Sequence, residues 1–455
     1  MKKDSILDEL RISQTDFVGK IYDSEINFLS IELKGVYYLN FEGCTFKQKV
    51  SFFNVNNQEI DVKFVNCKFE SDFEVKSCNF YSLEIVNIEE IKSIKISGGS
   101  SFKNLTIKSF ENELKSKILF SNVKVEENLD MSNLKIIEGE VKLNFKITNK
   151  EKSTVRFEDS LFQSLIFIGS DLGFDANFTN IKIIRLGYFY DCILNKSSFE
   201  NSDFGNEIVF SDCKFNSYVG FEDVENLSKT KFKISSCLFN GFPHFNRSKI
   251  KSLIIEHTTF EKKVSFDFVE MDVLKFYQVT FRDGAFFDYF KINEIEKCDM
   301  VTVRTIKREL VNSHNQIDYL KFKAYELEAY KKEKGKSWKD DFILNLNSFS
   351  SSNGLDWVKA LKFILLTSFV SYLFYLISYL ISIKSVVSSE FPNTVEEFLV
   401  YYLKFINPLM FLKSPIEDAE KYFFPLLFLL LGKILISYGI YQLIQAFRKF
   451  GKNGD

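Results

Sequence analysis

The chain has 455 residues, with 59 Lys and Arg against 61 Asp and Glu, and its aromatic residues are mainly 52 Phe and 20 Tyr. This apolar content, with only 5 Pro and 19 Gly, excludes a disordered or collagen-like chain. Basic side chains are scattered, since residues 1–300 carry 39 basic and 46 acidic residues and residues 301–455 carry 20 and 15. Binding along a nucleic-acid backbone needs clustered positive charge, so we expect no nucleic-acid partner.

The N-terminal residues and the cysteines indicate the cellular compartment. The first residues, MKKDSILDELRIS, are polar and lack the apolar stretch of a secretory signal. The seven cysteines are odd in number and do not show the C-x-x-C spacing of a metal site. We therefore expect a reducing compartment, free thiols, and neither a metal nor another cofactor.

A five-residue step recurs through residues 1–299. A large apolar residue is followed, three positions later, by a small or thiol residue and, two positions after that, by another large apolar residue. Examples are Phe41-x-x-Cys44-x-Phe46, Phe64-x-x-Cys67-x-Phe69 and Phe210-x-x-Cys213-x-Phe215. A period of five fits neither an amphipathic helix nor a strand, but it suits a chain that turns a corner every five residues with one bulky side chain pointing inward.

A longer spacing supports the same coiled path. Phe239, Phe260 and Phe281 are 21 residues apart, as expected if four five-residue faces make one coil. The predicted core residues are the large apolar and the thiol side chains on the five-residue step: Phe41, Cys44, Phe46, Phe64, Cys67, Phe69, Phe189, Cys192, Phe199, Phe204, Phe210, Cys213, Phe215, Cys237, Phe239, Phe260 and Phe281. Packing of a small thiol beside the Phe rings explains the cysteines without metal chemistry.

These residues resemble the pentapeptide-repeat family, which has a bulky central residue and a small residue two places earlier. The resemblance implies an all-β, right-handed quadrilateral β-helix over residues 1–299. Cys, Ser or Thr stands here where that family most often has Ala. Residues 84–150 fit the step poorly, and we expect a local break or a side bulge in that stretch.

The spacing of apolar residues becomes helical after Cys298. Val303, Ile306 and Leu310 lie three or four positions apart, as on one face of a helix, and His314 marks a break before a second helix. We expect this pair, within a linker of residues 300–361, to cap the open end of the solenoid. A basic stretch follows at Lys331, Lys332, Lys334, Lys336 and Lys339, and it suits attraction to anionic lipid headgroups.

Residues 362–455 are predicted to form a membrane domain in contact with the lipid bilayer. Residues 363–383 contain no charge and lie between Lys362 and Lys384, and residues 422–447 form a second span that precedes Arg448, Lys449 and Lys452. The loop between the spans has more acidic than basic residues, so the positive-inside rule predicts a multi-pass protein of the bacterial inner membrane with both ends in the cytoplasm. Within that loop, residues 394–412 are predicted to form an interfacial or a re-entrant helix.

Lys433 lies near the middle of the second span, where an isolated charge is costly. Either it reaches toward the interface, or it faces a watery path or a helix interface in a homo-oligomer, with Gly432 and Gly439 allowing close helix contact. The region resembles two-span modules that follow pentapeptide repeats in some bacterial proteins, some of which resemble two-helix ion channels. Potassium selectivity is not expected, because no T-V-G-Y-G-like run is present.

The chemistry-bearing motifs of common enzyme classes are missing from the sequence. It contains no P-loop, no G-x-G-x-x-G, no H-E-x-x-H and no G-x-S-x-G, and it has only 3 His. We therefore expect no catalytic residues and no enzyme activity. Two functions remain: a membrane-tethered scaffold or sensor that binds an unknown protein along the solenoid faces, and an oligomeric channel or membrane-permeabilising effector gated by the solenoid.

Overall fold

A computed structural model describes residues 15–29, 33–110, 112–226, 231–331, 337–383, 392, 394–410 and 413–448. The chain divides into two compact units, Met1–Ser313 and His314–Asp455, and each is described by itself. Several basic residues named above, Lys332, Lys334, Lys336, Lys384, Lys449 and Lys452, lie outside the described residues.

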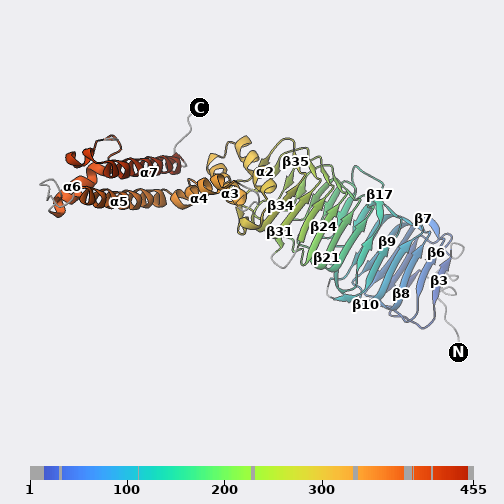
Figure 1. Cartoon of the computed structure of the whole chain (residues 1–455). Helices are drawn as coiled ribbons and strands as arrows, with labels where there is room; N and C mark the ends of the chain where they lie inside the picture. The colour runs from blue at the N-terminus through green and yellow to red at the C-terminus, as the bar shows by residue number, and fades with distance from the viewer. Residues whose placement is uncertain are drawn as a thin grey trace. The chain divides into compact units, whose positions relative to one another are not determined.

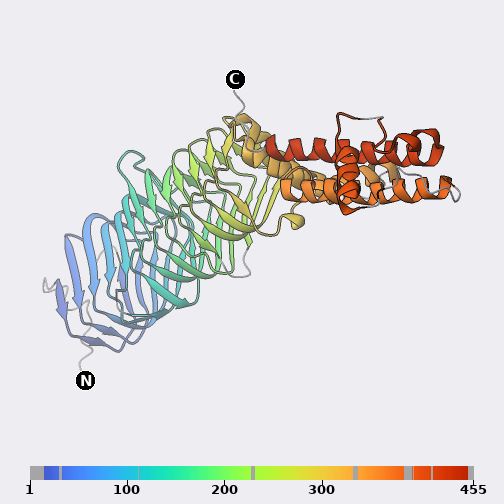
Figure 2. The ribbon, with the colours of Figure 1, turned by 90° about the vertical axis from the view of Figure 1, so that its left-hand side faces the viewer.

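The first unit is a parallel β-solenoid of about 12 turns, as the five-residue step predicts. Its strands stack coil on coil in Figures 1 and 2. One ladder comprises β1 (Asp16–Val18), β4 (Tyr38–Glu42), β7 (Asn56–Val65), β9 (Asn79–Val86), β11 (Ser101–Lys108), β14 (Val123–Asp130), β17 (Phe145–Ile147), β18 (Thr154–Arg156), β20 (Asp175–Asn177), β23 (Lys196–Ser198), β26 (Val219–Gly220), β30 (Pro243–His244), β33 (Val264–Ser265) and β36 (Ala285–Phe286).

Two further ladders complete the coils. The larger comprises β2 (Ile21–Tyr22), β3 (Ile26–Leu29), β5 (Thr45–Phe46), β6 (Val50–Phe53), β8 (Lys68–Lys76), β10 (Glu90–Ser97), β12 (Leu114–Lys115), β13 (Lys117–Phe120), β15 (Lys135–Glu138), β16 (Val141–Leu143), β19 (Leu161–Ile168), β21 (Lys182–Tyr190), β24 (Glu207–Ser211), β27 (Glu225–Asn226), β28 (Lys231–Ser235), β31 (Lys249–Glu256), β34 (Glu270–Tyr277) and β37 (Lys291–Ile292). The smaller comprises β22 (Ile193–Leu194), β25 (Lys214–Phe215), β29 (Leu238–Phe239), β32 (Thr259–Phe260) and β35 (Thr280–Phe281).

Stacked rings fill the interior of the coils. Phe215, Phe239, Phe260 and Phe281 form a continuous column with ring centroids 4.3, 4.8 and 5.2 Å apart. The separation matches the spacing of neighbouring strands in a sheet, because each ring comes from the equivalent position of the next coil. Burial of these rings is the main source of stability for the unit.

The coils turn at residues with left-handed backbone conformation. One line of corners runs through Asn133, Asp159, Asn180, Asn201 and Asp223, each with φ between 52° and 58°. Asn and Asp tolerate this conformation better than other residues with a side chain. The corners therefore explain why Asn and Asp recur two positions after an inward Phe or, at Asn133, an inward Met.

The expected break in residues 84–150 is not found in the described part of that stretch. β9 pairs with β11, β11 with β14, and β14 with β17 and β18, all in parallel. The coils continue because Ile, Leu and Val, such as Ile94 and Leu105, occupy the buried positions that Phe fills elsewhere. The irregularity is limited to register shifts, for example between Phe102 and Asn104.

A short helical segment covers the last coils. After η1 (Ile295–Lys297), Asp299 begins α2 (Met300–Asn312) by accepting a hydrogen bond from the Thr302 backbone N–H at 2.7 Å. The Thr302 hydroxyl accepts a hydrogen bond at 2.8 Å from the backbone N–H of Phe276, in β34. Helix α2 thus satisfies a strand donor that would otherwise be unpaired at the end of the solenoid.

The second unit is helical. It contains α3 (Gln316–Lys331), α4 (Trp338–Ser351), α5 (Trp357–Ser382), α6 (Val395–Ile406), η2 (Glu417–Lys421) and α7 (Phe423–Phe447). Helices α5 and α7 lie side by side as a hairpin in both views (Figures 1 and 2). Helix α4 was not expected from the sequence, because only a basic stretch was predicted in this part of the linker of residues 300–361. Helix α6 ends at Ile406 because Pro408 disfavours helical backbone at Asn407.

Candidate functional site

The residues predicted for the solenoid core lie in the interior of the first unit. All are buried: Phe41, Cys44, Phe46, Phe64, Cys67, Phe69, Phe189, Cys192, Phe199, Phe204, Phe210, Cys213, Phe215, Cys237, Phe239, Phe260 and Phe281. All seven cysteines are free thiols. These residues fill the interior of the coils and are not accessible to a partner. Their role is to support the strands whose other side chains form the outer faces.

The small residues of the five-residue step have a bonding role that the sequence did not reveal. The Cys213 thiol donates a hydrogen bond to the Phe189 carbonyl at 3.3 Å, and the Cys237 thiol donates to the Phe210 carbonyl at 3.5 Å. Ser202 occupies the same place in its own coil and donates to the Phe178 carbonyl at 2.9 Å. Cys and Ser recur at this position because each supplies a short donor to the preceding coil.

The line of corners ends with other residue types: Arg247, with φ of 59°, and then two exposed aromatic residues. Phe268 and Tyr289 occupy that corner in the last two coils, with φ of 59° and 55°. Their side chains are 57% and 77% exposed, and their rings stack at 4.8 Å. Asp267 and Asp288 precede them. Bulky residues in left-handed backbone are uncommon and strained, so this aromatic corner, Phe268 with Tyr289, is a candidate binding surface.

The candidate helix-interface residues come together inside the hairpin. Lys433, in α7, is 1% exposed, and its Nζ donates a hydrogen bond to the Asn407 carbonyl at 2.6 Å. Nζ also lies 5.9 Å from the ring centroid of Phe405. Asn407 follows the last residue of α6, where backbone carbonyls lack helical partners and carry partial negative charge. Lys433 therefore fixes the C-terminal end of α6 to α7.

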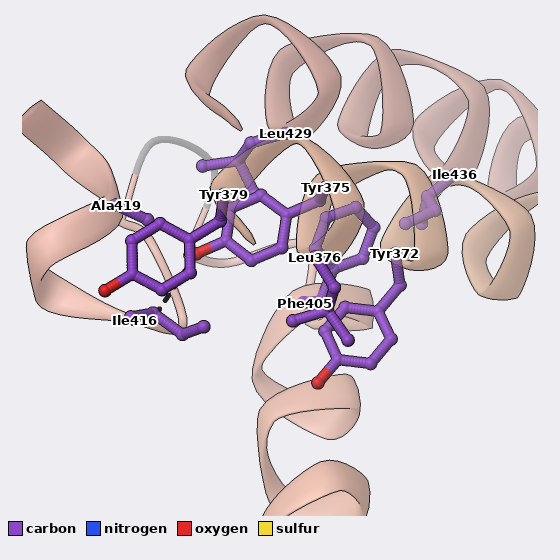
Figure 3. Close-up of a cluster of buried hydrophobic side chains, with 9 residues drawn as sticks. All are labelled: Tyr372, Tyr375, Leu376, Tyr379, Phe405, Ile416, Ala419, Leu429 and Ile436. Carbon is purple, nitrogen blue, oxygen red and sulfur yellow. Dashed lines mark hydrogen bonds between the residues drawn. The ribbon is translucent and has the colours of Figure 1, made fainter. Parts of the chain in front are cut away.

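Tyrosines on one face of α5 contact the chain segment that connects α5 to α7, which includes α6 and η2 (Figure 3). The Tyr372 hydroxyl donates to the Phe398 carbonyl at 3.2 Å. The Tyr375 hydroxyl lies 2.6 Å from Ser414 Oγ and accepts from the Ile416 backbone N–H at 3.3 Å. The sequence offered no signal for this role, because Tyr in an apolar span is also typical of an interfacial residue.

Gly432 and Gly439 make close contacts within the chain. A Cβ atom at Gly432 would lie 2.7 Å from the Phe405 ring, and one at Gly439 would lie 2.5 Å from Ile364 Cγ1. Only a residue without a side chain allows α7 to approach α5 and α6 so closely. In this structure both glycines therefore serve the packing of one hairpin.

Polar side chains join α4 to α7 at the other end of the hairpin. Asn347 Oδ1 accepts hydrogen bonds from the Tyr438 hydroxyl at 2.6 Å and from Gln442 Nε2 at 2.9 Å. Ser351 Oγ donates to Gln442 Oε1 at 2.6 Å. This satisfied network fixes α4 against the hairpin, since an unpaired polar group there would be costly.

The outward faces of the hairpin are apolar. Helices α5 and α7 are long and apolar enough to span a membrane, and only 39% and 33% of the residues in their most apolar stretches are buried. The core helix of a soluble protein would be mostly buried, whereas these two expose residues such as Leu366, Ile381 and Phe424. Among the described residues, no group of His, Cys, Asp and Glu could hold a metal ion.

Together these features define a class: a parallel β-solenoid protein that carries an apolar two-helix hairpin with polar contacts inside it. No family model, curated protein or solved structure matches the chain significantly. The function must therefore be argued from the geometry of the chain itself.

Proposed function

We propose that the chain is a non-enzymatic scaffold, held at a membrane by α5 and α7, whose solenoid binds a protein partner. The observation that carries this proposal is the aromatic corner of Phe268 and Tyr289. Asn or Asp suits the left-handed backbone of this corner, as at Asn201 and Asp223. Arg247 replaces them in the next coil and is held there by its ion pair with Asp223, whereas Phe268 and Tyr289 have no charged side-chain group that could pair with the neighbouring corner in this way. Two exposed aromatic rings at this position are best explained by binding.

The surroundings of the aromatic corner indicate the chemistry of the partner. Asp267 and Asp288 directly precede the two aromatic residues in the chain, and Asp267 accepts hydrogen bonds from the Ser265 hydroxyl and the Asp288 backbone N–H. Arg247, one coil away, is already paired with Asp223 at 2.8 Å. Stacked aromatic rings next to carboxylates favour a cationic side chain, above all Arg, which can stack on a ring and bind a carboxylate. We infer a protein partner that presents a basic residue to this corner.

The membrane location and the family assignment belong to the same proposal. The exposed apolar faces of α5 and α7, with basic residues at Lys362 and Arg448, support a hairpin in the bacterial inner membrane with both chain ends on the cytoplasmic side. The five-residue step and the stacked Phe columns support a pentapeptide-repeat solenoid with right-handed quadrilateral coils.

The contacts of Lys433, Gly432 and Gly439 favour the scaffold over the channel. Lys433 is bound to a carbonyl of its own chain. Side chains of α5 and α6 occupy the space next to Gly432, and side chains of α5 occupy the space next to Gly439. None of the three therefore needs an oligomeric pore to explain its presence, and we do not propose conduction.

The test compares partner binding by two double variants of the full chain in nanodiscs. Phe268→Asn with Tyr289→Asn restores the residue type of the earlier corners, so we expect unchanged or slightly higher stability and loss of the partner. Tyr37→Asn with Phe174→Asn removes two other exposed aromatic side chains and should leave binding intact. Equal partner recovery by both double variants in quantitative pull-downs would contradict the proposal.

A further inference from the structure

A cavity of about 250 Å³ lies where α3, α4 and α7 meet, close to the end of the hairpin at which α5 begins and α7 ends. Its wall includes Lys323 and Arg448, the amides of Asn347 and Gln445, and the apolar side chains of Leu320 and Leu327. The volume is below the range of about 300–1,000 Å³ that is typical of pockets for drug-sized ligands. It therefore suits a small polar group with an apolar extension.

The charge of this basic cavity is not compensated from its wall. Among the described residues that line it there is no carboxylate, and Oε1 of Glu328, which lies outside the lining, accepts a hydrogen bond from Asn353 Nδ2 at 2.7 Å. Lys323 and Arg448 are exposed, and neither forms an ion pair with any residue that the structure describes. Two cations that face one cavity without a direct ion pair attract an anion, and a guanidinium with an amide donor beside it matches the geometry of a phosphate.

The position of the cavity indicates where such an anion comes from. Trp357 begins α5 and stacks on Phe447 of α7 with ring centroids 5.7 Å apart. Aromatic residues at the ends of membrane helices lie at the level of the lipid headgroups. Leu320 and Leu327 then provide an apolar wall for the part of a lipid next to its phosphate.

We propose that the basic cavity binds the phosphate of an anionic phospholipid headgroup, with Lys323 and Arg448 as its cationic ligands. Basic pockets between helices at the membrane surface are a recurring site of this kind. The proposal rests on the proposed membrane anchoring of α5 and α7, and it adds a specific lipid site to it. A free phosphate ion offers the same chemistry, so the test must separate the two sources.

The experiment uses the full chain in nanodiscs of phosphatidylcholine with or without phosphatidylglycerol, released into native mass spectrometry to count retained lipids. We expect each chain to retain one phosphatidylglycerol. The affinity for this lipid should be about 10- to 30-fold weaker in the double variant Lys323→Gln with Arg448→Gln. The matched control is Lys404→Gln with Lys413→Gln, which removes the same charge from side chains that lie between α5 and α7 in the chain and do not line the cavity. This control should retain the lipid.

Competition with inorganic phosphate distinguishes the lipid from the free ion. Retention that millimolar phosphate leaves unchanged supports the lipid site, and displacement of the lipid by phosphate at that concentration would contradict it. Equal retention by both double variants, or equal retention of the two lipids, would also overturn the proposal. Vesicle flotation is measured in parallel, because failure to insert would reject the membrane anchoring itself and not only this site.

Discussion

Single side chains in this protein act mainly by satisfying backbone groups of a neighbouring segment. Ser202 and Cys213 donate to carbonyls of the preceding coil, and Lys433 donates to a carbonyl at the end of α6. Backbone groups buried at a corner or a helix end need such partners. Loss of a donor is therefore expected to matter more than loss of the small volume that each of these side chains occupies.

Ser202→Ala is expected to lower the free energy of unfolding of the solenoid by about 1–3 kcal/mol. The change leaves the Phe178 carbonyl and the Ile181 N–H without the hydroxyl that pairs with both. Ser202→Cys should lose less, because a thiol donor fills the equivalent position at Cys213. Chemical denaturation of the full chain in detergent, followed by circular dichroism, measures the difference. Equal stability of the Ala and Ser proteins would show that the hydroxyl bonds contribute nothing.

The buried thiol of Cys78 predicts a loss of stability at alkaline pH. Burial raises the pKa of the Cys78 thiol to about 11, above the value of about 8.5 for an exposed thiol. Between these values the unfolded chain releases the proton and the folded chain keeps it, so the free energy of unfolding falls as pH rises, by up to about 1.4 kcal/mol per pH unit for one thiol. Thermal unfolding at pH 7.5, 9 and 10 measures this slope, and Cys78→Ser should make it shallower.

At the scale of elements, the hairpin depends on close approach of its helices. Gly439 lies against Ile364 of α5, and Gly432 lies against Phe405 of α6 and Ser371 of α5. Tyr372 and Tyr375 hold the connecting segment from the α5 side. The hairpin and α6 therefore form one packed group of helices, in which each helix restricts the others.

Gly439→Leu is expected to separate α7 from α5 and to destabilise the hairpin by about 1–3 kcal/mol, because the added side chain overlaps Ile364. Ser437→Leu is the matched control, since Ser437 is exposed on the outward face of the same helix. Trp357 stacks on Phe447 and reports opening of the hairpin when Trp338 is replaced by Phe. Identical melting of the two Leu variants by tryptophan fluorescence would argue against tight packing at Gly439.

At the scale of the whole molecule, the surfaces of the two units suit different surroundings. The first unit hides its Phe columns and presents charged and polar side chains, as a solenoid in water does. The second exposes Leu, Ile and Phe over two long helices, which is stable only against lipid or another protein. This contrast is the physical basis of the proposed anchored scaffold.

Expression of the intact chain is expected to leave the membrane potential unchanged. A version truncated after Ser348 and a Lys433→Leu version should behave alike, because Lys433 binds a carbonyl within its own hairpin. A voltage-sensitive dye in expressing cells measures the effect. Depolarisation by the intact chain, absent in both altered versions, would instead support the channel and place Lys433 on its path.

The sequence by itself determined the solenoid and the two long apolar helices. The solenoid follows from periodicity, because Phe residues 21 apart stack if the coils repeat. The helices follow from composition, because an uncharged apolar run as long as residues 363–383 is typical of a helix that can span a bilayer. Residues 84–150 were harder to predict, because aliphatic side chains such as Ile94 and Leu105 fill the coil without the Phe signature.

Only the tertiary structure decided what the polar and glycine residues do. The Lys433 contact with Asn407, the network around Asn347 and the cavity beside Lys323 join residues that lie far apart in the chain. The aromatic corner becomes visible only when Phe268 and Tyr289 are aligned with the Asn and Asp corners of earlier coils. Periodicity specifies which face of an element is buried, but pairing between distant polar groups depends on how the elements pack, and no local pattern encodes it.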